Sequence, residues 1–358
     1  MGRLEHLNVL NGLVVNRVGG DTANDSCSLE EVGSLHKLRD LSIYKLERTD
    51  VRCCTEEETE RIEKVFDTAL RPSSSVHTLR FQNFFGRRYT RWLASTSICT
   101  LLPNIRLLDL HNCDRCPLLP LLEKLPGLDF LLIAGAPAVA IIGLEFFDSD
   151  AQESKRPSPV LFPKLTRLYL KRMPNLERWG WVAEHEGVAM PRLNKLVLAD
   201  CPKLESLPEG LSRHATCLTT LHLENVGALK SIRGLPSVRN LRVCGESGLE
   251  IVTDLPALEV LQLDRWWHVL SLPEWLLGGL PCLTALQKLD IECSNQLLRR
   301  FLHKDAKDWS KIERLPIVYI KDDRHNYVNY IKQSYTVETN LVDDDEDEDV
   351  AVEDDDDD

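Results

Sequence analysis

The amino-acid sequence predicts an α/β solenoid, an elongated array in which one short structural unit repeats along the chain. The chain has 358 residues. Because a compact domain usually has about 100–200 residues, this length predicts either several domains or one extended array. One apolar pattern decides for the array: apolar residues stand at positions 1, 4 and 7 of a short stretch, and position 9, after one variable residue, is apolar again.

The recurring pattern indicates leucine-rich repeats. Its clearest copies are "LHKLRDLSI", "LPGLDFLLI", "FPKLTRLYL", "MPRLNKLVL", "LPSVRNLRV", "LPALEVLQL" and "LTALQKLDI", and looser copies are "SVHTLRF", "LPNIRLLDL" and "TCLTTLHL". The final apolar pairs begin at ten leucines, 20 to 38 residues apart: Leu41, Leu79, Leu108, Leu131, Leu168, Leu196, Leu221, Leu241, Leu261 and Leu289. The stretch "LNVLNGLVV" suggests an eleventh copy.

Each copy predicts a short β-strand followed by an irregular or short helical return segment. Side chains alternate between the two faces of a strand, so the paired apolar residues point inward and the residue between them points outward. One such unit cannot bury its apolar side alone, so neighbouring units must stack. About eleven parallel strands at ~4.8 Å spacing give a curved horseshoe with a concave surface roughly 50 Å long. We expect this surface to be the binding face.

One long step between repeats contains a predicted helix, "TEEETERIEKVFDTALRP". Thr55 and Glu58 form a capping box, and Pro72 ends the helix. Its apolar residues follow helical spacing: Ile62, Val65, Phe66, Ala69 and Leu70. This stripe could dock a partner helix, but covering the repeat core from the convex side explains it with fewer assumptions.

The stretch "HNCDRC", His111 to Cys116, could bind zinc or exchange disulfides. A zinc site needs a second ligand pair, and the other cysteines fall in unrelated repeats. Cys113 follows Leu110 at the position where such repeats turn an Asn or Cys into the core, and Cys201 occupies the same place in "LVLADC". We therefore predict structural cysteines, no metal and no cofactor.

Charge is concentrated at one end of the chain. Residues 343–358 hold 13 acidic and no basic residues, so residues 1–342 carry 43 acidic and 43 basic groups. A neutral body with an acidic, disordered tail disfavours nucleic-acid binding. We expect a repeat solenoid over residues 1–322, an extension over 323–342 and the acidic tail. With no membrane segment and 11 scattered cysteines, a cytoplasmic or also nuclear location is expected.

The segment "LLPNIRLLDLHNCDRCPLLPLLEKLPGLDFLLIAGAPAVAIIGLEFF", followed by "LFPKLTRLYLKRMPNLERW", resembles the leucine-rich-repeat region of plant nucleotide-binding, leucine-rich-repeat disease resistance proteins. "CSLEEVGSLHKLRDLSIYKLE" and "LLRRFLHKDAKDWSKIERLPIVYI" extend the resemblance to about residues 1–322. It implies a sensor that recognises pathogen effectors or monitored host proteins, and that acts with a nucleotide-binding module.

The chain departs from this family in one respect, because it contains no G-x-x-x-x-G-K-[ST] phosphate loop. A truncated or partial receptor is therefore expected. The alternative is a freestanding leucine-rich-repeat scaffold or adaptor without immune switching. No enzyme is predicted, since "HEGVA" lacks the second histidine of a zinc protease and "GESGL" is not a nucleophile elbow.

The outward strand positions supply the predicted protein-binding residues. They are Arg167, Tyr169, Lys171, Lys195, His222, Glu224, Arg242, Gln262, Asp264, Lys288 and Asp290, and Trp267 joins them as the freer member of a tryptophan pair. Its neighbour Trp266 is predicted to pack against the core, and Trp179 of "WGW" is expected to be structural. Tryptophans matter here because they often dominate binding energy at protein interfaces.

Overall fold

The computed structural model describes residues 6–13, 32, 35–44, 56–70, 72–84, 86–95, 98–122, 125–143, 160–180, 188–302 and 309–341. Several features of the sequence lie outside these residues: the acidic tail, Thr55 of the predicted capping box, Trp181 of "WGW" and His185 of "HEGVA". The capping side chain of the predicted helix and the tail therefore have no structural description.

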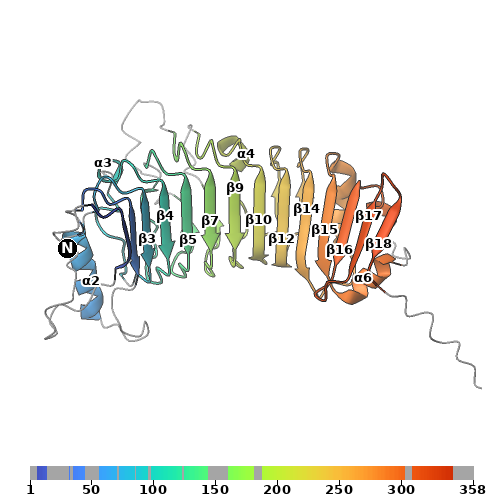
Figure 1. Ribbon diagram of the computed structural model, residues 1–358, viewed down its shortest axis with the longest axis horizontal. Helices are drawn as coiled ribbons and strands as arrows, with labels where there is room; N and C mark the ends of the chain where they lie inside the picture. The colour runs from blue at the N-terminus through green and yellow to red at the C-terminus, as the bar shows by residue number, and fades with distance from the viewer. Residues whose placement is uncertain are drawn as a thin grey trace, which may run out of the picture.

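One sheet of 14 strands runs the length of the molecule (Figure 1). Its strands, in spatial order, are β1 (Val9–Leu13), β2 (Asp40–Tyr44), β3 (Thr78–Gln82), β4 (Leu107–His111), β5 (Phe130–Ala134), β7 (Arg167–Lys171), β9 (Lys195–Ala199), β10 (Thr220–Val226), β12 (Asn240–Ser247), β14 (Val260–Trp266), β15 (Lys288–Cys293), β16 (Ile317–Lys321), β17 (Tyr327–Ile331) and β18 (Thr336–Thr339). Neighbours from β1 to β16 pair in parallel, whereas β17 and β18 pair antiparallel.

All ten predicted repeats form strands of this sheet, and β1 confirms the eleventh. A further parallel strand, β16, was not predicted, although its signal is present in the sequence. In "IERLPIVYI", Ile312, Leu315, Val318 and Ile320 have the spacing of the repeat, and all four are buried. This stretch was assigned to the closing segment of the family it resembles, so it was not counted as a repeat. β17 and β18, from the predicted extension, join the same sheet edge.

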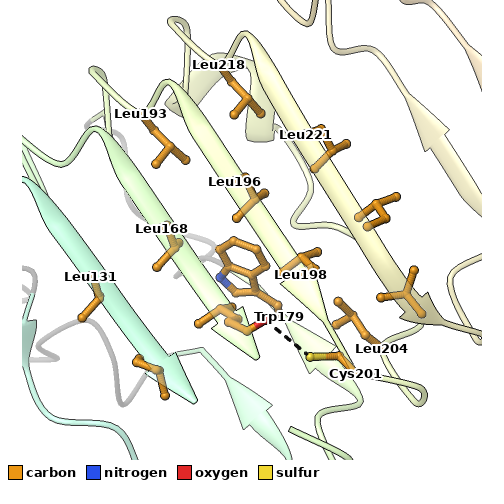
Figure 2. Close-up of a cluster of buried hydrophobic side chains, with 14 of the residues drawn as sticks. Leu131, Leu168, Trp179, Leu193, Leu196, Leu198, Cys201, Leu204, Leu218 and Leu221 are labelled. Atoms are coloured by element: carbon orange, nitrogen blue, oxygen red, sulfur yellow. Dashed lines mark hydrogen bonds between the residues drawn. The ribbon is translucent and has the colours of Figure 1, made fainter. Parts of the chain in front are cut away.

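The register of the sheet aligns the inward leucines into continuous rows. Leu131 pairs with Leu168, Leu168 with Leu196, and Leu196 with Leu221, and each is at most 5% exposed. Figure 2 shows this row together with Leu193 and Leu218 from the turns before β9 and β10. Each fully buried leucine contributes about 1.5–3 kcal/mol, so the stacked rows are the main stabilising feature of the fold.

Short segments cover the back of the sheet, as predicted. Two small parallel sheets pair β6 (Ile141–Ile142) with β8 (Arg178–Trp179) and β11 (Ser231–Arg233) with β13 (Ile251–Thr253). The remaining helices are α3 (Ile98–Leu101), α4 (Leu211–His214), α5 (Glu274–Gly279), η5 (Leu280–Cys282), α6 (Asn295–Leu302) and α7 (Trp309–Ile312). Trp179 is 5% exposed in this layer (Figure 2), which confirms its structural role.

The predicted helix is present as α2 (Glu56–Ala69) at the N-terminal end of the array (Figure 1). Phe66 and Leu70 are fully buried, as expected for its core-facing stripe. The Phe66 ring lies 6.1 Å from that of Phe81 and 5.5 Å from that of Phe84. α2 therefore packs on the repeat core near β3.

The C-terminal end of the array is closed by the two antiparallel strands and by aromatic packing. The Trp309 ring meets the Tyr330 ring edge-on at 5.3 Å, and Phe301 lies 6.4 Å from Trp309. Asp322 organises the turn between β16 and β17, because its carboxylate accepts hydrogen bonds from Asn295, Asn326 and the backbone of Arg324. Among the described helices, none has the length and apolar character needed to cross a lipid bilayer.

Candidate functional site

The candidate site is the face of the sheet whose side chains alternate with the buried leucines, called the open face below. On β7 to β15, positions one, three and five of the aligned strand segments supply its side chains, and the register places equivalent positions side by side. Tyr169, Val197, His222, Arg242, Gln262 and Asp290 form the middle row.

Eleven of the twelve predicted contact residues lie on this face, and all eleven are at least partly exposed. Arg167, Lys195 and Lys288 stand in the first row, and Lys171, Glu224 and Asp264 stand in the third. The rest belong to the middle row. The structure thus brings residues 120 positions apart in sequence onto one continuous surface, and their role in binding stays a prediction.

Trp267 departs from the prediction, because it lies one residue beyond β14 and outside the three rows. It lines a hollow of about 590 Å³ at the carboxyl ends of β12 and β14, with Arg265, Trp266 and Glu246. Both tryptophans are half-buried, and Trp266 packs against the core as predicted. Trp267 stands three residues after Asp264, the third-row residue of β14, and this position places it beyond the strand and off the open face.

An aromatic and cationic cluster stands at the middle of the open face. We call Phe130, Arg167, Tyr169, Lys171 and Lys195 the Tyr169 patch. The Phe130 and Tyr169 rings are 5.1 Å apart, and the Arg167 guanidinium lies 5.0 Å from the Phe130 ring. The ammonium groups of Lys171 and Lys195 lie 5.4 and 5.9 Å from the Tyr169 ring. Tyr169 therefore sits between two lysines at cation–π distance.

The two lysines of the Tyr169 patch have no carboxylate partner within the described part of the chain, whereas Arg167 pairs with Asp129 at 3.2 Å. Both lysines are half-buried. Val197, between Tyr169 and His222 in the middle row, is only 1% exposed, and its side chain makes the open face apolar at this point. The patch combines unpaired positive charge with an aromatic and apolar surface.

The open face from β10 to β16 has a different character, because its charges neutralise one another. Arg242 pairs with Asp264, and Arg265 pairs with Glu224. Further along the sheet, Lys288 contacts Asp290 at 2.9 Å and Lys321 contacts Glu292 at 3.3 Å. Four cations and four carboxylates thus form a self-neutralised lattice across β10, β12, β14, β15 and β16.

His222 separates the patch from the lattice. Burial lowers the pKa of its imidazole, and the nearby Arg242 guanidinium lowers this pKa further, against a smaller opposing effect of Glu224. The Nε2 atom of His222 lies 3.9 Å from the Glu224 carboxylate. A lowered pKa makes the neutral imidazole the dominant form at pH 7. His222 therefore adds no positive charge to the open face under these conditions.

The open face also includes residues of the N-terminal half that were not predicted. Arg80 and Asp109 continue the middle row on β3 and β4, and His111 stands beside Asp109 at 3.5 Å. Burial raises the pKa of the Asp109 carboxyl, although His111 and Arg80 oppose the shift. The side chain of Arg172, directly after β7, donates to Nε2 of His111 at the end of β4 at 2.5 Å. The outward-position rule would have identified these residues in "LRF" and "LLDLH".

The cysteines of "CDRC" lie in the core, as predicted. Cys113 is 1% and Cys116 0% exposed, and the Cys116 thiol donates to the Gly86 carbonyl oxygen at 3.2 Å. Burial raises the pKa of the Cys113 thiol to about 12 and also raises that of Cys116. Protonated, buried thiols are poor ligands and poor nucleophiles. Within the described residues, no group of three His, Cys, Asp or Glu side chains could hold a metal.

Comparison with known proteins agrees with the repeat architecture. The family model described as "R13L1/DRL21 LRRs" matches residues 1–136. A relative from Arabidopsis thaliana, "Putative disease resistance protein At3g14460", is 29% identical over 143 residues, which is 40% of this chain and 9% of the relative. The match therefore spans about a tenth of the length of that relative.

Among solved structures, the crystal structure of a TLR13–ssRNA13 complex is similar over 75% of this chain and 37% of the other, with 18% identity and a TM-score of 0.41. The fold assignment itself follows from the parallel sheet, the aligned leucine rows and the family match. The chain is a leucine-rich-repeat solenoid, and part of it is similar to one putative plant disease resistance protein.

Proposed function

We propose that the chain is a protein-recognition module of the plant innate immune receptor type. Its open face binds a pathogen effector or a host protein that the receptor monitors, without catalysing a reaction. The Tyr169 patch is the observation that carries this proposal, since it offers partly exposed aromatic surface flanked by two lysines that have no carboxylate partner among the described residues. Tyrosine and arginine are enriched among the residues that dominate protein–protein binding energy.

The two parts of the open face have different roles in this proposal. The Tyr169 patch anchors the partner, because Lys171 and Lys195 beside the Tyr169 ring have no carboxylate partner within the described chain. The self-neutralised lattice over β10 to β16 provides selectivity, since a partner must match its alternating charges or break existing ion pairs. A nucleotide-binding receptor module is a further expected partner.

We place the protein in the cytoplasm. Five of the eight cysteines within the described residues are buried, and these five are free thiols. Free thiols that are spread through a repeat core are typical of proteins from reducing compartments, whereas secreted repeat proteins commonly carry disulfides.

Proximity labelling in plant cells tests the proposal with three chains. The first is the natural chain, and the second carries Tyr169→Ala with Lys195→Glu. The third carries Leu118→Ala, an exposed position in the segment between β4 and β5, off the open face. We expect the natural and Leu118→Ala chains to label the same partner, and the open-face variant to lose it.

The partner so identified is then purified and titrated by calorimetry against the same three chains. Loss of a central aromatic anchor weakens binding by about tenfold or more. Circular dichroism confirms that the variants remain folded. An open-face variant that is folded and retains full affinity would refute recognition through this patch.

A further inference from the structure

We propose that the acidic C-terminal segment, residues 343–358, binds in cis to the Tyr169 patch. The first support is charge complementarity. The segment has 13 carboxylates and no cation, whereas the patch holds two lysines without a carboxylate partner among the described residues. The rest of the chain is balanced, with 43 acidic and 43 basic residues, so the segment and the patch are the natural counterparts.

The pattern of ion pairs explains why the segment binds at β7 and β9 rather than at strands nearer to its origin. Every cation of the lattice over β10 to β16 already contacts a carboxylate. An acidic segment would meet carboxylates such as Glu292 and Asp264 there, and repulsion disfavours that contact. Among the described residues of the open face, the first cations without a carboxylate partner that it reaches are Lys195 and Lys171.

Burial favours the Tyr169 patch over the lysines close to the C-terminal end. Lys311 and Lys332 are exposed, and an ion pair between fully hydrated groups gains little free energy. Lys171 and Lys195 are half-buried against the Tyr169 ring and near the apolar Val197. Coulombic attraction is stronger in such partly desolvated surroundings.

The length of the segment suffices, and it specifies which carboxylates make the contact. β18 is parallel to β16, so the chain leaves the sheet at the edge where Lys171 stands. Eight strand spacings separate β18 from β7, which is ~40 Å at ~4.8 Å each. Residues 342–352 reach at most ~40 Å, and residues 342–358 reach ~60 Å. The distal run, Glu353 to Asp358, therefore lies at the patch.

Tethering makes even weak attraction effective. A segment attached to the same chain has an effective concentration in the millimolar range. Contact in cis therefore forms at any protein concentration and weakens with salt, because the Debye length falls from ~30 Å at about 0.01 M to ~4 Å at about 0.5 M. A segment held there would compete with any macromolecule that uses the patch.

Lysine acetylation of the full-length protein, read residue by residue by mass spectrometry, tests the contact. Three chains are compared: the natural chain, a distal variant with Glu353→Gln and Asp→Asn at 354–358, and a matched proximal variant with Asp→Asn and Glu→Gln at 343–349. At about 0.01 M salt, the acetylation rates of Lys171 and Lys195 should be lower in the natural chain than in the distal variant by a factor of about three or more. The proximal variant should retain most of this protection.

Lys311 and Lys332 serve as internal references, and their rates should be equal in all three chains. Protection at Lys171 and Lys195 should disappear at about 0.5 M salt, and a tenfold dilution should leave it unchanged. Equal rates at these two lysines in the natural and distal chains would overturn the proposal. It would also be overturned by protection that shifts to the reference lysines, that depends only on the proximal run, or that is lost on dilution. No outcome depends on an external partner, so the test is independent of the proposed function.

Discussion

The residue that follows the fifth aligned position of many strands has a left-handed backbone. Asn83, Asn112, Asp200 and Asn225 have φ between 51° and 57°. Asn and Asp tolerate this conformation better than other residues with a Cβ atom. Their side chains also link adjacent repeats, since the Asn112 amide donates to Asn83 Oδ1 at 2.8 Å and the Asn225 amide donates to Asp200 Oδ1 at 2.7 Å. These corners mark the end of the five-residue aligned segment in these strands.

Close approach between repeats makes Gly248 irreplaceable. A Cβ atom at this position would lie 1.9 Å from the Gly227 carbonyl oxygen of the preceding repeat, and neither backbone can yield without moving the stack. We expect Gly248→Ala to lower the free energy of unfolding by about 2–3 kcal/mol. Gly278→Ala in α5 is the control, because its Cβ would meet nothing within 4 Å. It should raise stability by up to about 1 kcal/mol. Urea unfolding measures both, and equal effects would contradict the steric account.

The buried thiols give the protein a specific sensitivity to alkaline pH. Burial raises the pKa of Cys201 from 9.0 to about 11. Because the folded-state pKa exceeds the unfolded one, the stabilisation is complete below pH 9 and is lost as pH rises toward 11. We expect the natural chain to lose about 2–3 kcal/mol more than Cys201→Ala across this interval.

Urea unfolding at a series of pH values from 8 upward would measure this difference in slope. Cys201→Ala removes core volume, which lowers stability by an amount independent of pH, so only the change with pH is compared. Parallel curves for the two chains would show that the Cys201 thiol does not govern the alkaline limb.

At the scale of single elements, α2 is attached to the array by two kinds of contact: ion pairs and hydrogen bonds of its acidic residues, and packing of one aromatic side chain. Glu63 accepts a hydrogen bond from the Arg87 backbone at 2.6 Å and pairs with Arg88 at 3.2 Å. Asp67 accepts from the Arg91 backbone at 2.6 Å. These contacts join the helix to residues 86–91, while Phe66 enters the core between Phe81 and Phe84. The polar contacts of Glu63 and Asp67 and the packing of Phe66 therefore attach the helix together.

Of these two kinds of contact, packing of the Phe66 ring should contribute more to stability. Phe66→Ala removes a fully buried ring and should cost about 3–5 kcal/mol, because a cavity remains between Phe81 and Phe84. Glu60→Ala, at an exposed position of the same helix, should change stability by less than about 0.5 kcal/mol. Limited proteolysis within residues 56–70 reports local release of α2. Similar cleavage rates for both variants would show that the Phe66 ring does not hold the helix.

At the scale of the whole molecule, stability is a sum over neighbours. Each strand pairs only with the strand before and after it, and the leucine rows connect adjacent repeats (Figure 2). Arrays of this kind behave approximately as one-dimensional chains of coupled units. Damage to one repeat should therefore spread to its neighbours and fade along the sheet.

Hydrogen exchange can follow that decay. Leu196→Ala removes a fully buried leucine from β9 and should cost about 2–5 kcal/mol. We expect faster exchange in β7, β9 and β10, and unchanged exchange in β15 and β16, because local opening does not require global unfolding. Uniform acceleration from β2 to β16 would instead show that the array unfolds as one cooperative unit.

The sequence by itself determined the strands, their inward leucines and the buried Cys113 and Cys201, because a period-two pattern repeated eleven times has one stable packing solution. It also contained the signal for β16 in "IERLPIVYI". Tertiary structure alone decided which outward residues stay unpaired. Lys171 and Arg242 occupy outward positions on β7 and β12, yet of these two only Arg242 has a carboxylate partner among the described residues, Asp264 of β14. The reason is that ion pairing and burial across strands depend on register between residues 20 to 38 positions apart, which a single repeat does not encode.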